Sequence, residues 1–433
     1  MKTREMKIAM SILCMALSIV VHAADYDFVV DGIYYHYRTS DKTASVATRS
    51  GFQTTIPYYE GNVVVPAQVN YNGRTMNVTE VEHSAFYYSK NLLSVTLPNT
   101  VKKIGTGAFS ECKGLKSVVL ADAITEIADN MFSGCASLTD VEIPSSVVKI
   151  GGHVFEGCTS LKSISIPNSV TQMEGSVFKD CTALENIVLS EGLVGVSSYC
   201  FQNCAGLRSV HLPTSGKLQY VGSHSFENCT GLTVISLPRG VRVDNAAFYQ
   251  CTNVHKLVLG EESEGTGSIT FADYKYNNQH PLGGCQIDTI CYRYNVTMAG
   301  QNIFYNSDLL KVLYIGGEHP LRMYRFGENI EKVYAMFPDP TVSACIFPDK
   351  VYVNATLYVP KGTKEKYMAA SGWENFFNVV ETDYDTAGIP SLSLTGSEIQ
   401  RYYDLNGRRT EKLQPGVNIV RYNDGKTKKV LVK

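Results

Sequence analysis

The sequence predicts a solenoid made mostly of β-strands, in which short units coil one upon another. Three observations lead to this prediction. A phenylalanine recurs at a nearly constant interval, a cysteine follows it after three residues, and a leucine follows it after six. A unit of about 23 residues cannot bury its apolar face alone, so neighbouring units must stack and share one continuous core.

The repeated phenylalanines define eight units. They are spaced by 23 residues five times and then by 25 and 22, and they are Phe86, Phe109, Phe132, Phe155, Phe178, Phe201, Phe226 and Phe248. The cysteine slot holds Ser89 in the first unit and then Cys112, Cys135, Cys158, Cys181, Cys204, Cys229 and Cys251. The leucine slot holds Leu92, Leu115, Leu138, Leu161, Leu184, Leu207, Leu232 and finally Val254. This regularity indicates a repeat array and not a chance pattern.

Each unit is expected to contain a short strand and a second buried edge. After the leucine, apolar residues such as Val118 and Leu120 alternate with polar ones, which indicates a strand with one buried face. A proline such as Pro98 then closes the strand, because proline cannot continue a β-ladder. The spacing of Val101 and Ile104 recurs in later units and predicts that the opposite edge of each coil is also buried.

The first residues are interpreted as a targeting segment. Basic residues precede an apolar run from Ile8 to Val21, and Ala23 ends a sequence typical of signal-peptide cleavage. The run is shorter than the roughly 20 residues that a membrane-spanning helix needs. We therefore expect a secretory signal peptide at residues 1–23, no transmembrane segment, and a protein that is secreted or displayed on the cell surface.

The remaining chain divides into five expected segments. Alternating strands broken by glycine turns predict an N-terminal β cap at residues 24–80, which would cover the open end of the solenoid. Regular repeats are expected at residues 81–260, and irregular repeats with a terminal cap at residues 261–380. A linker is expected at residues 381–392 and a small C-terminal β tail, with three strand runs, at residues 393–433.

The repeat unit resembles that of a known family. Units such as G-A-F-S-E-C-K-G-L-K-S-V-V-L and G-G-H-V-F-E-G-C-T-S-L-K-S-I-S-I-P are similar to the leucine-rich repeats of BspA-like bacterial surface proteins, from about Val81 to Gly260. The resemblance implies an α/β-type but mostly β solenoid, a right-handed coil with a parallel concave sheet. It also implies a terminal unit that ends the stack with a short helix carrying Tyr367 and Trp373.

The same resemblance implies a location and a class of partner. Proteins of this kind sit on the exterior of the outer membrane of Gram-negative bacteria and adhere to host or bacterial surface proteins. The tail at residues 393–433 is similar to the C-terminal β tails of exported proteins from such bacteria, including type IX sorting domains. It is shorter than a full sorting domain, which leaves open whether it sorts or anchors the protein.

Composition and motifs argue against several functional classes. Lys+Arg 39 against Asp+Glu 41 gives a net charge of -2, which provides no basic field for nucleic acid. The usual signatures of hydrolases, zinc proteases and nucleotide-binding enzymes are absent from the sequence. We therefore expect no enzymatic activity, no catalytic residue, no metal and no cofactor, and we expect a monomer.

The slot cysteines are expected to be buried thiols. Their side chains would point the same way in successive coils, which is poor geometry for disulfides and unsuited to tetrahedral zinc. Small buried thiols with a weak hydrogen-bond donor fit the slot better. Cys285 and Cys291 lie six residues apart in a poorly repeated region, and for this one pair a disulfide remains open.

One slot of the repeat predicts a binding surface. It lies between the two inward residues of each strand, is expected to line the concave face, and runs Thr96, Val119, Glu142, Ser165, Val188, His211, Ser236, Val258, Tyr314, Tyr334 and Tyr358. Tyrosine is enriched at protein interfaces and stacks on sugar faces. The predicted binding residues are therefore Tyr314, Tyr334, Tyr358 and His211, although the tyrosines could instead serve cross-strand packing.

The sequence thus predicts a binding or adhesion module for protein partners that acts through its concave sheet. Two other functions stay open. One is a glycan-binding accessory protein that uses the tyrosines, and the other is an enzyme with no recognisable motif.

Overall fold

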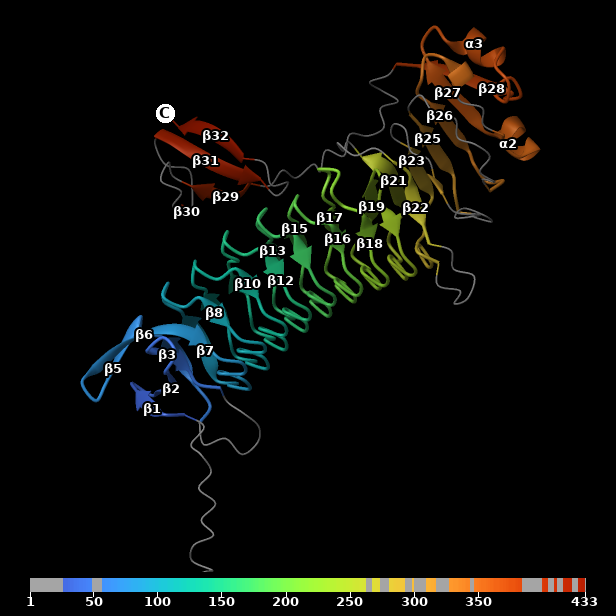
Figure 1. Ribbon diagram of the computed structural model, residues 1–433. Helices are drawn as coiled ribbons and strands as arrows, with labels where there is room; N and C mark the ends of the chain where they lie inside the picture. The colour runs from blue at the N-terminus through green and yellow to red at the C-terminus, as the bar shows by residue number, and fades with distance from the viewer. Residues whose placement is uncertain are drawn as a thin grey trace, which may run out of the picture.

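The computed structural model describes residues 26–48, 57–261, 267–272, 280–292, 298–299, 309–316, 327–342 and 346–383, and the backbone of four strands beyond residue 398. The expected signal peptide and most of the expected linker lie outside the described residues. The described chain is mostly β-structure with very little helix, and its coils stack side by side into an elongated solenoid (Figure 1). This arrangement confirms the predicted fold class.

Most coils contribute one strand to a first column of parallel sheets. The strands pair in chain order within three sheets. The first sheet contains β4 (Gly61–Val64), β7 (Leu92–Thr96), β9 (Ser117–Val119) and β11 (Asp140–Val141), and the second contains β13 (Ser163–Ser165), β15 (Asn186–Val188) and β17 (Ser209–His211). The third sheet contains β19 (Val234–Pro238), β21 (Lys256–Glu261), β23 (Thr289–Tyr292), β25 (Val312–Ile315), β26 (Lys332–Ala335), β27 (Thr356–Pro360) and β28 (Asn378–Thr382). The pairing continues through the irregular region, as its strand-like sequence predicts.

A second column of very short parallel strands forms the opposite edge of the coils, where the sequence predicts that residues such as Val101 and Ile104 are buried. Its members are β8 (Lys103–Ile104), β10 (Glu126–Ile127), β12 (Lys149–Ile150), β14 (Gln172–Met173), β16 (Gly195–Val196), β18 (Tyr220–Val221), β20 (Arg242–Val243), β22 (Ile269–Phe271) and β24 (Met298–Ala299). The inward residues Ile127, Ile150 and Met173 lie side by side in register and are buried. The coils that contribute strands β7 to β23 to the first column therefore have two hydrogen-bonded sides.

The repeated phenylalanines fill the space between the two columns. All eight rings are fully buried. Consecutive rings stack nearly parallel, with centroids 5.0 to 5.5 Å apart from Phe86 to Phe248. This spacing is close to the separation of about 4.7–4.9 Å between neighbouring strands. The rings therefore form one continuous core, as the repeat predicts.

The slot cysteines form a second column beside the rings. Each thiol donates a hydrogen bond to the backbone carbonyl of the phenylalanine one coil earlier, for example from Cys135 to Phe109 at 3.1 Å. Burial raises the pKa of five of these thiols, those of Cys135, Cys158, Cys181, Cys204 and Cys229. In the first coil, the Ser89 hydroxyl instead accepts a hydrogen bond from the backbone N–H of Tyr59 at 3.1 Å. The slot thus requires a small side chain with a polar atom.

No disulfide joins the ten cysteines that the structure describes. Cys285 occupies the cysteine slot of an irregular coil, where its thiol donates to the carbonyl of Phe248 at 3.3 Å. Cys291 lies instead on β23, in register with Val258 and Tyr314. The two cysteines therefore belong to different positions of the coil, which accounts for the absence of a bridge between them.

Folded and denatured protein should differ sharply in thiol reactivity. Because the thiolate is the reactive form and burial raises the pKa, the seven slot cysteines from Cys112 to Cys251 should resist iodoacetamide in the folded state. After denaturation without reductant, all seven should be alkylated when measured by mass spectrometry. Disulfide-linked peptides joining neighbouring slots would contradict the hydrogen-bonded arrangement.

The N-terminal strands form a sheet that continues into the solenoid. It consists of β1 (Phe28–Val30), β2 (Ile33–Arg38), β3 (Thr43–Val46), β6 (Arg74–Val81) and β5 (Gln68–Tyr71), in that spatial order. Strand β6 runs parallel to β3 on one side and also pairs in parallel with β8. The second column of the solenoid therefore begins within this sheet.

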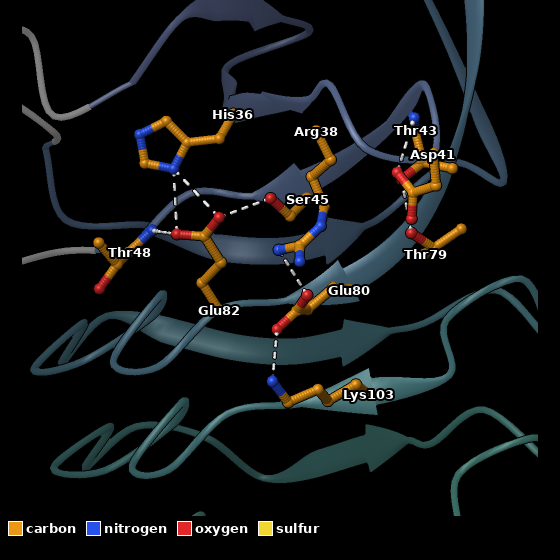
Figure 2. Close-up of polar contacts among 10 residues, drawn as sticks. All are labelled: His36, Arg38, Asp41, Thr43, Ser45, Thr48, Thr79, Glu80, Glu82 and Lys103. Carbon is orange, nitrogen blue, oxygen red and sulfur yellow. Dashed lines mark hydrogen bonds and ion pairs between the residues drawn. The ribbon is translucent and has the colours of Figure 1, made fainter.

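Two carboxylates join the N-terminal sheet to the first coil, as Figure 2 shows. Glu82 accepts hydrogen bonds from the Ser45 hydroxyl at 2.5 Å and the Thr48 backbone N–H at 3.0 Å, and it lies 3.0 Å from His36 Nδ1. Its neighbour in sequence, Glu80, has a separate set of partners. Glu82 therefore connects β2, β3 and the segment after β6.

Glu80 forms the second connection. Its carboxylate pairs with Arg38 of β2 at 2.7 Å and with Lys103 of β8 at 3.1 Å (Figure 2). Arg38 belongs to the N-terminal sheet, whereas Lys103 belongs to the first full coil. Three strands that are distant in sequence are thus held by one side chain.

The C-terminal end of the solenoid is closed by short helices around aromatic side chains. These helices are η1 (Pro340–Val342), α2 (Asp349–Asn354) and α3 (Lys364–Met368). Tyr367 of α3 is fully buried, and its hydroxyl donates to the carbonyl of Phe337 at 2.7 Å. Trp373 is also fully buried but lies in the turn after α3. The expectation that both residues are on the helix is therefore wrong for Trp373, because the helix ends at Met368.

The tail forms a small antiparallel sheet of its own. Its strands are β29 (Ile399–Tyr403), β30 (Arg409–Thr410), β31 (Gly416–Tyr422) and β32 (Thr427–Val432), in the spatial order β30-β29-β31-β32. The sequence predicted three strand runs, and the short β30 is the additional one. Within the described part of the chain, no helix is both long and apolar enough to cross a bilayer.

Candidate binding surface

The structure brings three of the four predicted binding residues into one row. Tyr314 of β25, Tyr334 of β26 and Tyr358 of β27 pair directly in the parallel register. Their ring centroids are 4.4 and 4.5 Å apart, and neighbouring rings are inclined by only 8° and 12°. Because adjacent strands lie about 4.7–4.9 Å apart, this stacking follows from the register. We call these three residues the tyrosine row.

The stacking determines what the tyrosine row can offer to a partner. Both faces of the Tyr334 ring are covered by its neighbours, and Val380 of β28 lies in register beyond Tyr358. The three side chains are half-buried. The row therefore presents ring edges and hydroxyl groups, and it does not present open ring faces.

The hydroxyl groups are well suited to hydrogen bonding at neutral pH. Burial, followed by the proximity of Tyr334 and Cys291, raises the pKa of Tyr314 to about 12. Its hydroxyl therefore stays protonated and can donate as well as accept a hydrogen bond.

The outward slot is not an open surface along its whole length. Val258 of β21 and Cys291 of β23 occupy this slot next to Tyr314, yet both are fully buried. The expectation that Val258 lines an open face is therefore wrong. The row at the C-terminal end is separated by this covered stretch from the exposed Val119 and Thr96 at the N-terminal end.

The fourth predicted residue lies apart from the row. His211 is half-buried on β17, in register with Val188 of β15. Strands β19, β21 and β23 lie between it and Tyr314 in the first column. A contact with the tyrosine row would therefore require a partner that bridges several coils. Among the described residues, no cluster of histidine, cysteine or acidic side chains could hold a metal ion.

The stacked coils, with one strand and one buried leucine slot per unit, define a leucine-rich-repeat protein. A model of the BspA type leucine rich repeat region matches residues 79–194 and 176–311, with 6 copies. These matches span more than half of the 433 residues. The chain therefore belongs to the BspA-type leucine-rich-repeat family, whose stacked repeats generally serve as binding modules.

Solved structures of bacterial leucine-rich-repeat proteins are similar to this chain. A protein from Bacteroides ovatus is 20% identical, with a TM-score of 0.48 over 83% of this chain and 100% of its own. A T. pallidum protein is 29% identical, with a TM-score of 0.40 over 48% and 90%. A leucine rich cell surface protein from Faecalibacterium prausnitzii is 18% identical, with a TM-score of 0.41 over 83% and 96%. A search of curated proteins finds no match.

Proposed function

We propose that this protein is an exported, non-enzymatic module that adheres to protein partners on host or bacterial surfaces. The observation that carries this proposal is the tyrosine row, formed by Tyr314, Tyr334 and Tyr358. Membership of a repeat family that generally binds proteins supports it, and the apolar run before Ala23 supports export. In this proposal the row is the central contact, and His211 is a peripheral one.

The geometry of the row favours a protein partner over a sugar. Aromatic recognition of a sugar ring uses an open aromatic face, and the rings of the row cover one another. Tyrosines at protein interfaces combine apolar contact area with a hydroxyl that finds a hydrogen-bond partner. Three hydroxyl-bearing edges in one line supply both kinds of contact.

A triple substitution by phenylalanine at Tyr314, Tyr334 and Tyr358 tests this proposal. It keeps the stacked rings and removes only the hydroxyl groups, so the melting temperature should change little. Partners would first be identified on an array of host matrix proteins, bacterial surface proteins and glycans. Affinity for the protein partner, measured by biolayer interferometry, should fall at least tenfold, or about 1.4 kcal/mol.

A matched control lies on the polar half of the same face. Combined Thr96→Ala and Ser165→Ala substitutions should leave the affinity unchanged, because both residues lie far from the row along the first column. If the control weakens binding and the triple variant does not, the contact surface lies elsewhere on the solenoid.

A further inference from the structure

The C-terminal tail differs in charge from the rest of the chain. Residues 399–433 contain nine basic and three acidic side chains, a net charge of +6, whereas the whole chain carries -2. The four strands of the tail sheet contain basic residues and no acidic one, and the basic residues are Arg401 on β29, Arg409 on β30, Arg421 on β31, and Lys428 and Lys429 on β32. One sign of charge concentrated on a small sheet attracts anions.

The antiparallel register places four of these basic residues on one face of the tail sheet. Directly paired residues lie on the same face, and the two faces alternate along each strand. Two rows of paired residues share this face. They are Arg401, Arg421 and Thr427 in the first row, and Arg409, Tyr403, Ile419 and Lys429 in the second. We call the face that these two rows define the basic face.

The other face of the sheet has a different composition. Val420 pairs there with Tyr402 on one side and with Lys428 on the other. Val430 and Val432 of β32 occupy the same face. Among the strand residues of the tail, Lys428 is the only charged one on this face. The basic residues are therefore segregated, and the tail sheet is amphipathic.

The pairing within the sheet does not explain why these charges are collected. Arg401 of β29 and Arg421 of β31 are paired directly. Like charges in this position destabilise a sheet, because their side chains are held close together. An anion bound at the basic face reduces this repulsion. The arrangement is therefore more favourable when the face is in contact with negative charge.

The apolar residues of the basic face indicate which kind of anion fits it. Tyr403 and Ile419 lie between Arg409 and Lys429 in the second row, and Val417 pairs with Leu431 on the same face. Surfaces that lie on anionic membranes combine basic residues with apolar and aromatic ones, and tyrosine is enriched where a membrane meets water. A soluble polyanion would use the charges of this face but not its aliphatic residues.

We propose that the basic face of the tail sheet docks onto a lipid surface rich in anionic headgroups and so holds the protein at a membrane. This role goes beyond the adhesion proposed for the tyrosine row and does not depend on it. It also gives the tail an anchoring function. Each basic residue near an anionic lipid surface strengthens binding about fivefold, which corresponds to about 1 kcal/mol.

Cosedimentation of the mature chain with lipid vesicles tests this proposal. Vesicles of phosphatidylglycerol and phosphatidylcholine in equal parts should bind the protein, and vesicles of phosphatidylcholine alone should not. Added sodium chloride should weaken the binding, because salt screens the attraction between exposed charges. The triple phenylalanine variant of the tyrosine row should bind the vesicles as the wild type does.

Two adjacent lysines provide a matched pair of variants. Lys429→Gln and Lys428→Gln remove the same charge from the same strand, but the register places them on opposite faces. Lys429→Gln should weaken vesicle binding about fivefold, and Lys428→Gln should weaken it less than about twofold, because its face is directed away from the lipid and salt screens the remaining attraction.

The arginine pair provides a second test. Combined Arg401→Gln and Arg421→Gln substitutions should weaken vesicle binding at least tenfold. Combined Arg401→Lys and Arg421→Lys substitutions keep both charges and should preserve binding. This second variant separates the loss of charge from a disturbance of the sheet.

Four results would overturn the proposal. The first is equal binding to charged and uncharged vesicles, and the second is no binding to either. The third is an equal effect of Lys428→Gln and Lys429→Gln, or a loss of binding when both arginines are replaced by lysine. The fourth is binding of heparin or duplex DNA without binding of phosphatidylglycerol vesicles, which would assign the basic face to a soluble polyanion.

Discussion

Replacing Phe155 by alanine should lower the free energy of unfolding by about 3–5 kcal/mol, as expected for a buried aromatic side chain. Phe155 is fully buried and lies between Phe132 and Phe178, with centroid distances of 5.5 and 5.3 Å. The rings on either side belong to other coils, whose backbones are fixed by strand pairing. The cavity therefore cannot close easily, and both neighbouring coils should lose contacts.

Urea denaturation followed by circular dichroism would measure this loss. Hydrogen exchange would show whether amides of the two adjacent coils exchange faster, as nearest-neighbour coupling in a repeat array predicts. The control is Phe377→Ala, because Phe377 is 78% exposed and its removal should change stability by only about 0.5 kcal/mol. A Phe155→Ala variant as stable as the wild type would show that the stacked rings are not the core.

The repeat architecture could be predicted because its core positions require particular side chains. The phenylalanine rings stack on those of the next coil, and each slot cysteine donates to a phenylalanine carbonyl of the preceding coil, so the same residue types recur at fixed offsets. The left-handed position before the cysteine slot shows no such pattern. This position requires only that the backbone adopt a positive φ. Residues as different as Gly134, Asn203 and Gln250 do so, with φ between 60° and 74°.

The binding surface could be predicted only in part. The register that aligns Tyr314, Tyr334 and Tyr358 follows from the repeat offsets, even in irregular coils. Cys291 was not assigned to this slot, because its coil is longer than the regular unit. The burial of Val258 and Cys291 was not predictable either, since the coverage of an outward slot depends on contacts beyond the repeat unit.

The contact between Tyr58 and Tyr88 at the N-terminal end left a single indirect signal in the sequence. Tyr58 and Tyr88 are separated by 30 residues, and only the pairing of β4 with β7 brings their segments together. An irregularity in the repeat would have been the available indication, because Tyr88 stands where other units have small, acidic or amide residues.

Replacing Glu82 by alanine should lower the free energy of unfolding by about 1–3 kcal/mol. It should also weaken the attachment of the N-terminal sheet to the first coil. The substitution leaves the hydroxyl of the buried Ser45 and the N–H of Thr48 without their acceptor, and it removes the partner of His36. Hydrogen exchange should localise the effect to β3 and β6. The control is Glu328→Gln, since the Glu328 side chain is 67% exposed and its replacement should change the free energy of unfolding by only about 0.5 kcal/mol.

The same carboxylate should make the N-terminal sheet sensitive to acid. Burial on its own raises the pKa of Glu82, but hydrogen bonds from Ser45 and Thr48 and the proximity of His36 outweigh it, so the pKa lies below its usual value. The folded state therefore binds a proton at Glu82 less readily than the unfolded state. The resulting stabilisation is fully present above the unfolded pKa of about 4.3 and is lost as the pH falls through the lower folded value.

Melting temperatures measured by circular dichroism between neutral pH and about pH 3 would test this expectation, since that range extends below the unfolded pKa of glutamate. The wild type should lose stability steeply below that pKa, whereas Glu82→Gln should start less stable and lose less over the same range, because glutamine cannot titrate. Equal losses in the two proteins would mean that Glu82 is protonated equally readily in the folded and unfolded states, contrary to the hydrogen bonds that surround it.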